Sequence, residues 1–293
     1  RIPMIVAVAS GKGGTGKTTV AVSLALAAAR EAAAKQRRVA LLDCDVEEPN
    51  AHLFLQPMAT ERREVGILTP VVDETKCTYC RRCAEVCAFH AIAVLGKQVL
   101  VFGELCHGCG SCTWNCPENA IHEELRTTGV VEVGPANGLT LGYGRLNVGE
   151  PMAGPLIREV KKLGDGPARP DTVILDAPPG TSCPVVDTLR GADYALMVTE
   201  PTPFGLHDLR MAVQVARDEL GLPVGVVVNR DGVGDSGVDD YCRAEQIPIL
   251  LRIPLDRRIA EACSDGHPLV EALPEYAARF RDLYRRIREE AKR

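Results

Sequence analysis

The chain has 293 residues, of which 46% are hydrophobic and 25% are charged, and its formal net charge is -5. This length and composition predict a folded chain with a substantial core, built as one large domain or as a large domain with a small insert. The acidic balance gives no general electrostatic reason to bind nucleic acid, so we expect neither DNA nor RNA as a partner.

The first residues, RIPMIVAVAS, form an apolar run that is too short to cross a bilayer. The run leads directly into a glycine-rich loop without a small-residue cleavage site, which predicts a buried strand rather than a secretory signal. We therefore expect a cytoplasmic protein in a reducing compartment, with membrane binding disfavoured. Its twelve cysteines are then expected to be thiols or metal ligands rather than disulfides.

Short apolar runs alternate with helix-like stretches, which predicts an α/β fold with a mostly parallel sheet covered on both faces. The alanine-rich segment 18–31 is expected to be a helix. Four of the strands end in Ser, Asp, Glu or Asn, and a fifth has Asp next to its last residue. Ligands of open α/β sheets bind beyond the carboxyl ends of the strands, so we expect the site there. The strands expected are IVAVAS, RVALLD, TVILDA, YALMVTE, VGVVVN and the run at 249–253.

The alternation stops between about residues 72 and 123, where eight of the twelve cysteines gather. This break indicates an inserted module. We therefore expect a discontinuous domain of residues 1–71 and 124–293 and an inserted domain of residues 72–123. The glycine-rich segment 130–149 is expected to return the chain to the sheet through a loop or hairpin, and residues 165–170 are expected to form an exposed turn.

The segment GKGGTGKTT lies between a predicted strand and a predicted helix, which is the context in which such a loop binds phosphate. Its backbone N–H groups would close on phosphate oxygens at a helix N-terminus. Lys17 would reach the β and γ phosphates, and the Thr18 hydroxyl would bind Mg²⁺. The nucleotide-binding residues expected in this loop are Gly11, Lys12, Gly13, Gly14, Thr15, Gly16, Lys17, Thr18 and Thr19.

The second lysine of this loop, Lys12, makes the sequence resemble the deviant Walker A class of P-loop NTPases, the SIMIBI or MinD-like ATPases. This class includes MinD, the nitrogenase iron protein and the Mrp-type iron–sulfur carriers. The resemblance implies that Lys12 crosses a dimer interface to the partner's nucleotide, so that ATP joins two identical or related subunits face to face. A solvated loop lysine is the alternative, because lysines are mostly exposed.

Two further segments match this family. In LLDCDVEEPN the resemblance implies that Asp45 positions the attacking water and that Asp43 supports the Mg²⁺ shell. In VILDAPPGT it implies that Asp176 holds an Mg²⁺-bound water and that the Gly180 N–H faces the γ-phosphate. Each aspartate taken alone has an alternative role at a strand end or helix cap.

The strand VGVVVN ends in Asn229, where the family places a base-reading asparagine. The guanine signature Asn-Lys-x-Asp is absent, because the next residues are Arg230, Asp231 and Gly232, so we expect ATP rather than GTP. The segment 253–266 resembles the family's last strand, loop and helix. The resemblance implies a Mg²⁺-dependent ATP hydrolase whose catalytic residues are Lys12, Lys17 and Asp45.

Two cysteine combs share the spacing CxxCxxCxxxC, which is the bacterial ferredoxin pattern, in which the fourth cysteine of each comb ligates the other cluster. Zinc is the alternative metal, although structural zinc sites use CxxC or Cys/His pairs rather than a doubled comb. Ala88 replaces the usual proline of the first comb, which removes no ligand. The pattern predicts two [4Fe–4S] clusters, the first held by Cys77, Cys80, Cys83 and Cys116 and the second by Cys87, Cys106, Cys109 and Cys112.

Other residues near these motifs receive weaker interpretations. His90 and His107 lie beside the combs and are expected to be surface or packing residues, because eight cysteines already complete two cubanes. Cys44 and Cys183 are expected to be small buried residues, with redox activity as the alternative. The amphipathic terminal segment YAARFRDLYRRIREEAKR is expected to pack against the sheet, with membrane binding as the alternative.

The whole chain therefore resembles MinD-superfamily ATPases with a small inserted α+β ferredoxin-like domain. Three functions remain open. In the first, as in the nitrogenase iron protein, ATP turnover controls electron transfer from the clusters to a redox partner protein. In the second, as in Mrp-type carriers, the ATPase assists assembly of a metallocofactor, although no CxxC follows Cys116. In the third, the ATPase positions partners as MinD does. The first is narrowly favoured.

Overall fold

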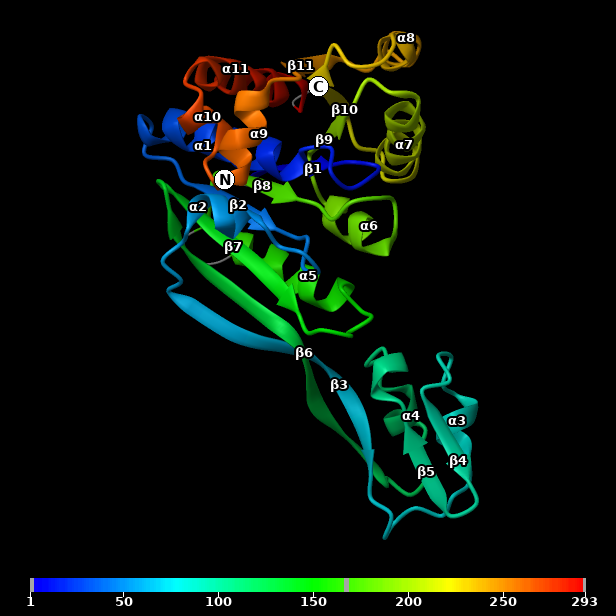
Figure 1. Cartoon of the computed structure of the whole chain (residues 1–293). Helices are drawn as coiled ribbons and strands as arrows, with labels where there is room; N and C mark the ends of the chain where they lie inside the picture. The colour runs from blue at the N-terminus through cyan, green and yellow to red at the C-terminus, as the bar shows by residue number, and fades with distance from the viewer. Residues whose placement is uncertain (1–2, 166–168, 292–293) are drawn as a thin grey trace.

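The computed structural model describes residues 3–165 and 169–291 and shows an α/β body from which a small module projects (Figure 1). Residues 166–168 of the turn expected at 165–170 lie outside the described residues. The strands are β1 (Met4–Ala9), β2 (Val39–Asp43), β3 (Glu61–Val72), β4 (Ile92–Leu95), β5 (Gln98–Val101), β6 (Ile121–Ala136), β7 (Leu139–Leu146), β8 (Thr172–Asp176), β9 (Tyr194–Thr199), β10 (Val224–Asp231) and β11 (Ile249–Pro254). The helices are α1 (Lys17–Ala33), α2 (Ala51–Leu55), α3 (Arg82–Glu85), α4 (Ser111–Trp114), α5 (Gly154–Lys162), α6 (Cys183–Leu189), α7 (Pro203–Val213), α8 (Gly237–Ala244), α9 (Arg257–Ser264), α10 (Leu269–Ala272) and α11 (Glu275–Glu290), with short helical turns η1 (Gly103–Leu105), η2 (Leu163–Asp165) and η3 (Gln214–Glu219).

The described strands of the body form one nine-stranded sheet in the order β11-β10-β9-β1-β8-β2-β7-β6-β3. Neighbours from β11 to β7 run parallel, whereas β6 is antiparallel to β7 and β3 is antiparallel to β6. The mostly parallel sheet expected from the sequence is confirmed, and each expected strand lies in its parallel part. The segment 130–149 forms the turn of the β6–β7 hairpin and most of both its arms, also as expected.

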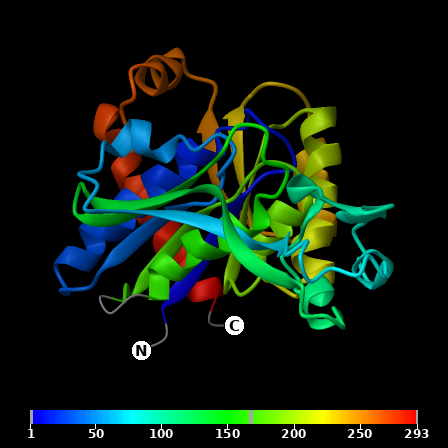
Figure 2. The same cartoon turned by 90° about the horizontal axis from the view of Figure 1, so that it is seen from below.

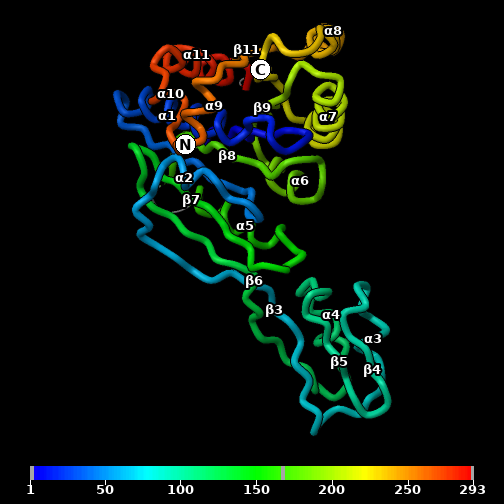
Figure 3. The backbone as a smooth tube through the Cα atoms, viewed as in Figure 1, coloured from blue at the N-terminus to red at the C-terminus, as the bar shows by residue number. Residues whose placement is uncertain are grey.

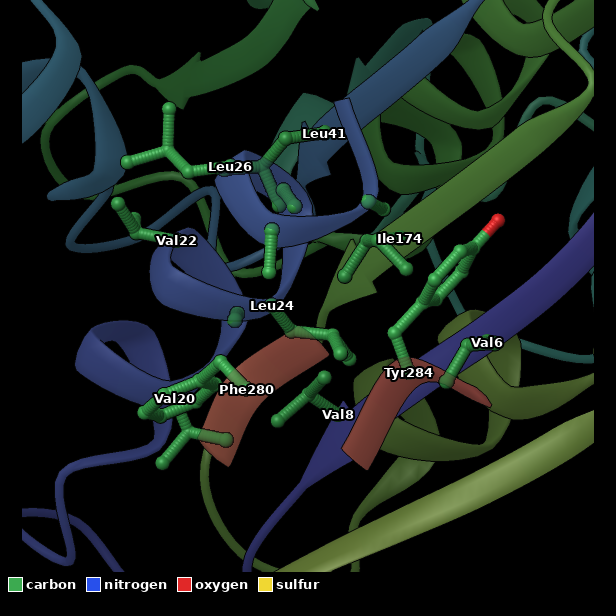
Figure 4. Close-up of a cluster of buried hydrophobic side chains, with 14 of the residues drawn as sticks. Val6, Val8, Val20, Val22, Leu24, Leu26, Leu41, Ile174, Phe280 and Tyr284 are labelled. Carbon is green, nitrogen blue, oxygen red and sulfur yellow. The ribbon is translucent and has the colours of Figure 1, made fainter. Parts of the chain in front are cut away.

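One face of the sheet is covered by α1 and α11, which are far apart in sequence and lie side by side. Figure 4 shows Val8 of β1 below Leu24 of α1 and to the right of Phe280 of α11, and all three side chains are excluded from solvent. Burial of a large aliphatic or aromatic side chain contributes about 1.5–3 kcal/mol relative to leaving it exposed. The apolar face of the terminal segment is therefore used in the core, which confirms the packing expected for it: Tyr276, Phe280, Leu283, Tyr284 and Ile287 are all buried.

A long antiparallel ribbon joins the body to the projecting module. Strands β3 and β6 pair from Glu61 and Val133 in the body to Val72 and Ile121 at the module. Figure 2 shows the two strands from below, running together toward the module. We call the outer part of this ribbon, residues 64–72 and 121–129, the stalk. The module between its strands holds the small antiparallel β4–β5 sheet with α3 and α4.

The sequence did not predict β3 or the outer half of β6. A two-stranded ribbon buries few side chains, so its strands lack the continuous apolar runs that identified the others.

Candidate functional site

The glycine-rich loop connects β1 to α1 at the carboxyl edge of the parallel strands, where the site was expected. Two of its glycines permit close backbone approach. A Cβ on Gly11 would lie 2.2 Å from the carbonyl oxygen of Asp208, and one on Gly16 would lie 2.4 Å from Nδ2 of Asn229. Asn229 in turn donates a hydrogen bond to the carbonyl of Thr15 at 2.7 Å, so this expected base reader also holds the loop.

The structure brings together the lysine and the aspartates that the sequence singled out. The Lys17 Nζ lies 2.7 Å from Oδ1 of Asp176, and both side chains are buried. The β2–β8 register places Asp43 directly beside Asp176. Asp43 accepts hydrogen bonds from the backbone N–H groups of Asp45, Asn50 and Ala51 at 3.0–3.1 Å.

These carboxylates carry more negative charge than one lysine can neutralise. Burial, together with the charge of Asp176, raises the pKa of Asp43 to about 7. Burial also raises the pKa of Asp45 to about 6. For Lys17, burial lowers the pKa, but the carboxylates led by Asp176 outweigh it, so its pKa is raised. The second oxygen of Asp176, Oδ2, is buried without a partner, which leaves it free to accept from a metal-bound water.

The second loop lysine folds back onto its own chain. The Lys12 Nζ lies 3.3 Å from Oε2 of Glu200, and the other oxygen of Glu200 accepts from the guanidinium of Arg230. Arg230 also donates to the carbonyl of Gly14 at 3.2 Å. Sequence reasoning gave Glu200 and Arg230 no role, although Glu200 follows a strand at the carboxyl edge of the sheet, which was the available signal.

The other residues expected to bind nucleotide lie in or beside the glycine-rich loop. Thr18 and Thr19 open α1 directly after Lys17. Gly180 has a positive φ of 94°, and its N–H donates to the carbonyl of Ser10 at 3.0 Å, so in this conformation the N–H is directed to the chain itself. A pocket of about 190 Å³ opens beside the loop, and α9 and the end of β11 close its far side; its lining residues include Gly16, Thr19, Asn229, Ile253, Cys263 and Leu269.

The cysteines of the projecting module line two separate cavities. Each cavity is lined by three cysteines of one comb and the fourth cysteine of the other, which is the cross-over arrangement that the spacing predicts. Within residues 3–165 and 169–291, no three His, Cys, Asp or Glu side chains converge closely enough to bind a single metal ion. The quartets are Cys77, Cys80, Cys83 and Cys116 around one cavity, and Cys87, Cys106, Cys109 and Cys112 around the other.

The two combs adopt the same backbone conformation at three matching positions, although the first has no glycine there and the second has glycine at two of them. Non-glycine residues at positive φ persist where the surrounding structure fixes them. The combs are therefore two copies of one loop. The matching pairs are Tyr79 and Gly108 (φ 58° and 64°), Arg81 and Gly110 (68° and 72°), and His90 and Asn119 (52° and 49°).

Equivalent backbone N–H groups approach equivalent sulfurs in the two combs. The first cysteine of each comb accepts from the residue two positions later, and the fourth accepts from the residue four positions later. Hydrogen bonds of this kind stabilise negative charge on cysteine sulfur and tune the clusters that thiolates hold. The bonds run from Tyr79 to Cys77 and from Gly108 to Cys106 at 3.4 Å, from Ala91 to Cys87 at 3.2 Å and from Ala120 to Cys116 at 3.3 Å.

The other singled-out residues have distinct environments. His107 stacks on Phe89 with ring centroids 3.7 Å apart, and both line the second cavity, so His107 has the packing role expected. Cys44 is buried as expected, and burial raises the pKa of its thiol. The same expectation is wrong for Cys183, which is exposed at the start of α6, because only one side of that short helix contacts the body.

None of the helices within the described ranges is long and apolar enough to span a membrane.

A glycine-rich loop after the first strand, a buried lysine and strand-end aspartates define a P-loop nucleotide-binding protein. Residues 6–269 match the family model described as CobQ/CobB/MinD/ParA nucleotide binding domain, and the chain belongs to this family. The deviant Walker A relationship expected from the sequence is thereby confirmed at the level of the family.

Relatives resemble this chain over most of its length. It is 34% identical to one uncharacterized protein of Methanocaldococcus jannaschii, over 92% of both chains, and 28% identical to another, over 98% of both. It is 25% identical to the iron-sulfur cluster carrier protein of Pseudomonas fragi, over 92% of this chain and 79% of the carrier.

Solved structures share the fold. The septum site-determining protein MinD of Pyrococcus horikoshii, solved with Mg-ADP, superposes with a TM-score of 0.59 and 20% identity, covering 98% of this chain and 96% of MinD. The cell division ATPase MinD of Pyrococcus furiosus gives 0.57 and 21%, covering 98% and 99%. At this identity the likeness establishes the fold alone.

Proposed function

We propose that this chain is a Mg²⁺-dependent ATP hydrolase that holds two [4Fe–4S] clusters and couples nucleotide turnover to electron transfer to a redox partner protein. The observation that carries the proposal is the pair of cavities, each lined by the cysteine quartet that ferredoxin spacing assigns to one cluster. The P-loop body and the cysteine-rich module belong to one chain and are joined by the stalk. This arrangement suits a protein in which nucleotide turnover in the body controls electron transfer from the module.

In the nucleotide half, each residue takes the role that its position supports. Lys17 binds the β and γ phosphates, and Thr18 binds Mg²⁺ together with the water shell that Asp43 and Asp176 orient. Asp45 positions the attacking water, and its raised pKa of about 6 still leaves it ionised near neutral pH. The pocket beside Asn229 receives the adenine ring. Catalysis then depends on positioning and on neutralising phosphate charge.

In the proposed dimer, Lys12 leaves Glu200 and reaches the partner's nucleotide. Glu200 keeps Arg230 as an ionic partner when Lys12 departs, which lowers the cost of the exchange. The second subunit is an identical chain or a related one. Methanocaldococcus jannaschii has two proteins similar to this chain, which supports pairing of related chains as well as of identical ones.

The insert, which we place at residues 72–123, is proposed to be a ferredoxin-like domain. The cavities, the repeated positive-φ positions and the paired N–H···S hydrogen bonds all fit two cubanes held by thiolates. The four thiols of each quartet line a cavity and do not converge on a single point. A [4Fe–4S] cluster binds each thiolate at a different iron, whereas a zinc ion needs all four sulfurs around one atom, so this arrangement suits a cluster better. When bound, such clusters supply one-electron transfer.

Metallocofactor assembly is the second candidate, favoured by the 25% identity to the iron-sulfur cluster carrier of Pseudomonas fragi. Positioning of partners in the manner of MinD is the third. Its support from the terminal segment is weak, because the apolar face of α11 is buried in the core.

Two substitutions test the nucleotide assignment. Lys17→Ala and Asp45→Ala are expected to abolish ATP hydrolysis while leaving the visible absorbance of the clusters intact, because both residues lie in the body rather than the insert. Normal turnover in both variants would overturn the assignment. Cys109→Ser is expected to lose iron, and Cys183→Ser, also an exposed cysteine but outside both quartets, is the matched control that keeps it.

A further inference from the structure

An ion pair joins the stalk to a loop of the body. Arg126 of β6 makes a bidentate contact with Glu150, with Nη1 to Oε2 at 2.5 Å and Nη2 to Oε1 at 3.2 Å. The Glu150 side chain is only 4% exposed. Glu150 lies in the loop between β7 and α5, so the contact joins two parts of the chain that the hydrogen bonds of the sheet do not join at this point.

The same arginine also touches the insert. A Cβ placed on Gly103 would lie 3.2 Å from Cδ and 3.4 Å from Nε of Arg126, so the arginine stem packs on the backbone of η1. The turn η1 leads directly into Cys106, a cysteine of the second quartet. Arg126 therefore contacts the body through its guanidinium and the cluster-binding module through its stem.

The stalk needs such a brace because it is an irregular two-stranded ribbon. Its register shifts between Val65 and Gly66, and a Cβ on Gly66 would lie 2.2 Å from the carbonyl oxygen of Arg126. A bulge bends and twists a strand locally, and an isolated ribbon is only marginally stable. Side-chain contacts therefore add support to the ribbon here: Asn147 donates to the carbonyl of Thr127 at 3.1 Å, and Arg126 pairs with Glu150.

On the other side, Glu150 leads toward the nucleotide site. The loop that holds it continues into α5, and α5 is tied to α6 by an ion pair between Arg158 and Asp187 at 3.2 Å. Lys161 of α5 also donates to three backbone carbonyls at the end of α6, at 2.7–2.9 Å. The helix α6 follows residues 176–182, the loop that contains Asp176 and Gly180. Figure 3 traces this succession from α6 through α5 to β6.

We propose that Arg126 is a positioning residue through which the nucleotide state of the body sets the placement of the insert. Rearrangement of the 176–182 loop displaces α6 and α5 as one unit, Glu150 moves with α5, and Arg126 carries the displacement to η1 and the stalk. This inference rests on the proposed function and names the contact that would couple its two halves. The quantity that tests this role is the coupling between the nucleotide site and the stalk.

Hydrogen exchange on the full, cluster-loaded chain makes that measurement, with and without Mg-ADP. In the native sequence we expect the nucleotide to change exchange both in residues 176–190 and in the stalk. In Arg126→Gln and in Glu150→Gln, the nucleotide is expected still to change exchange in residues 176–190 but no longer to change exchange in the stalk. Arg126→Glu combined with Glu150→Arg is expected to restore the change in the stalk. Arg62→Gln is the matched control, because Arg62 pairs with Glu132 inside the sheet and should leave both changes intact.

Iron content and ATP hydrolysis, measured on the same samples, separate the two proposals. A native chain without clusters or hydrolysis would overturn the proposed function, whereas the exchange data would still report on the stalk. A stalk that responds equally in Arg126→Gln and in the native chain would overturn the positioning role. So would a native, cluster-loaded chain that responds to Mg-ADP at residues 176–190 but not in the stalk. If Arg126→Gln fails to fold, Arg126→Lys, which keeps the charge but not the bidentate fork, is expected to show a reduced stalk response, and a full response would overturn the proposal.

Discussion

Replacing Lys17 by Met tests whether the buried ion pair between Lys17 and Asp176 stabilises the fold before nucleotide binds. The ammonium group lies 2.7 Å from Asp176, with the two side chains 7% and 0% exposed. Removing one partner of a buried ion pair costs about 3–5 kcal/mol, because the remaining charge has no counterion. For a chain of this size, a loss of about 4 kcal/mol lowers the melting temperature by roughly 10 °C.

The loss should depend on pH in a defined direction. The carboxyl groups beside Lys17 have raised folded-state pKa values, about 7 for Asp43 and about 6 for Asp45, so acidification protonates them in the folded chain. Lys17 stays charged throughout this range, because its own pKa is raised. Lys17→Met should therefore be most destabilised near pH 8, where the carboxylates are ionised, and less so near pH 5.

Calorimetric melting without nucleotide at about pH 8 and about pH 5 measures both effects. Lys12→Met is the matched control, because Lys12 is one-third exposed and its partner Glu200 keeps Arg230, so a change below about 1 kcal/mol is expected. A loss in Lys17→Met no larger than in this control, or one equal at both pH values, would refute the electrostatic argument.

Three further predictions concern the nucleotide site and the insert. Gly11→Ala should weaken Mg-ADP binding at least about tenfold by calorimetric titration, because its Cβ would lie 2.2 Å from a carbonyl oxygen of α7; an affinity equal to that of the native chain would refute the clash. Mg-ADP affinity should rise between about pH 6 and pH 8 as Asp43 loses its proton, and a flat or falling profile would count against Asp43 as a metal-shell residue. Trp114, the chain's single tryptophan, stands between two predicted cluster ligands and is highly exposed, so its fluorescence should be quenched when clusters are loaded and recover when they are removed. Identical fluorescence in loaded and stripped protein would place the iron elsewhere.

The sequence predicted the parts of the molecule whose residues make strong local patterns. Buried parallel strands need continuous apolar runs, so β1, β2 and β8 were recognisable. Asp43 and Asp176 were singled out because they end β2 and β8, and Lys17 because it closes the glycine-rich loop before α1. The spacing of the combs predicted two cross-over quartets, and the same cysteines line the two cavities; that each quartet holds a cluster is the proposal.

The parts that the sequence left open depend on contacts between distant segments. The stalk strands carry mixed polar and apolar residues, because they are only partly covered, and therefore gave no strand signal. The pairs Lys12–Glu200 and Arg126–Glu150 join residues that are remote in sequence or lie on different elements, and no local pattern identifies such partners. Cys183 was expected to be buried, but its exposure is decided by which side of α6 meets the body.

The central claim is that one chain holds two clusters whose state responds to nucleotide. Anaerobic purification, iron and sulfide analysis, and electron paramagnetic resonance of the reduced protein without nucleotide, with Mg-ADP and with Mg-ATP test it directly. The account predicts about eight iron atoms per chain, as two cubanes require, and a cluster spectrum or potential that shifts with nucleotide. Zinc in place of iron would contradict the cluster assignment, and a full complement of iron with spectra indifferent to nucleotide would contradict the coupling.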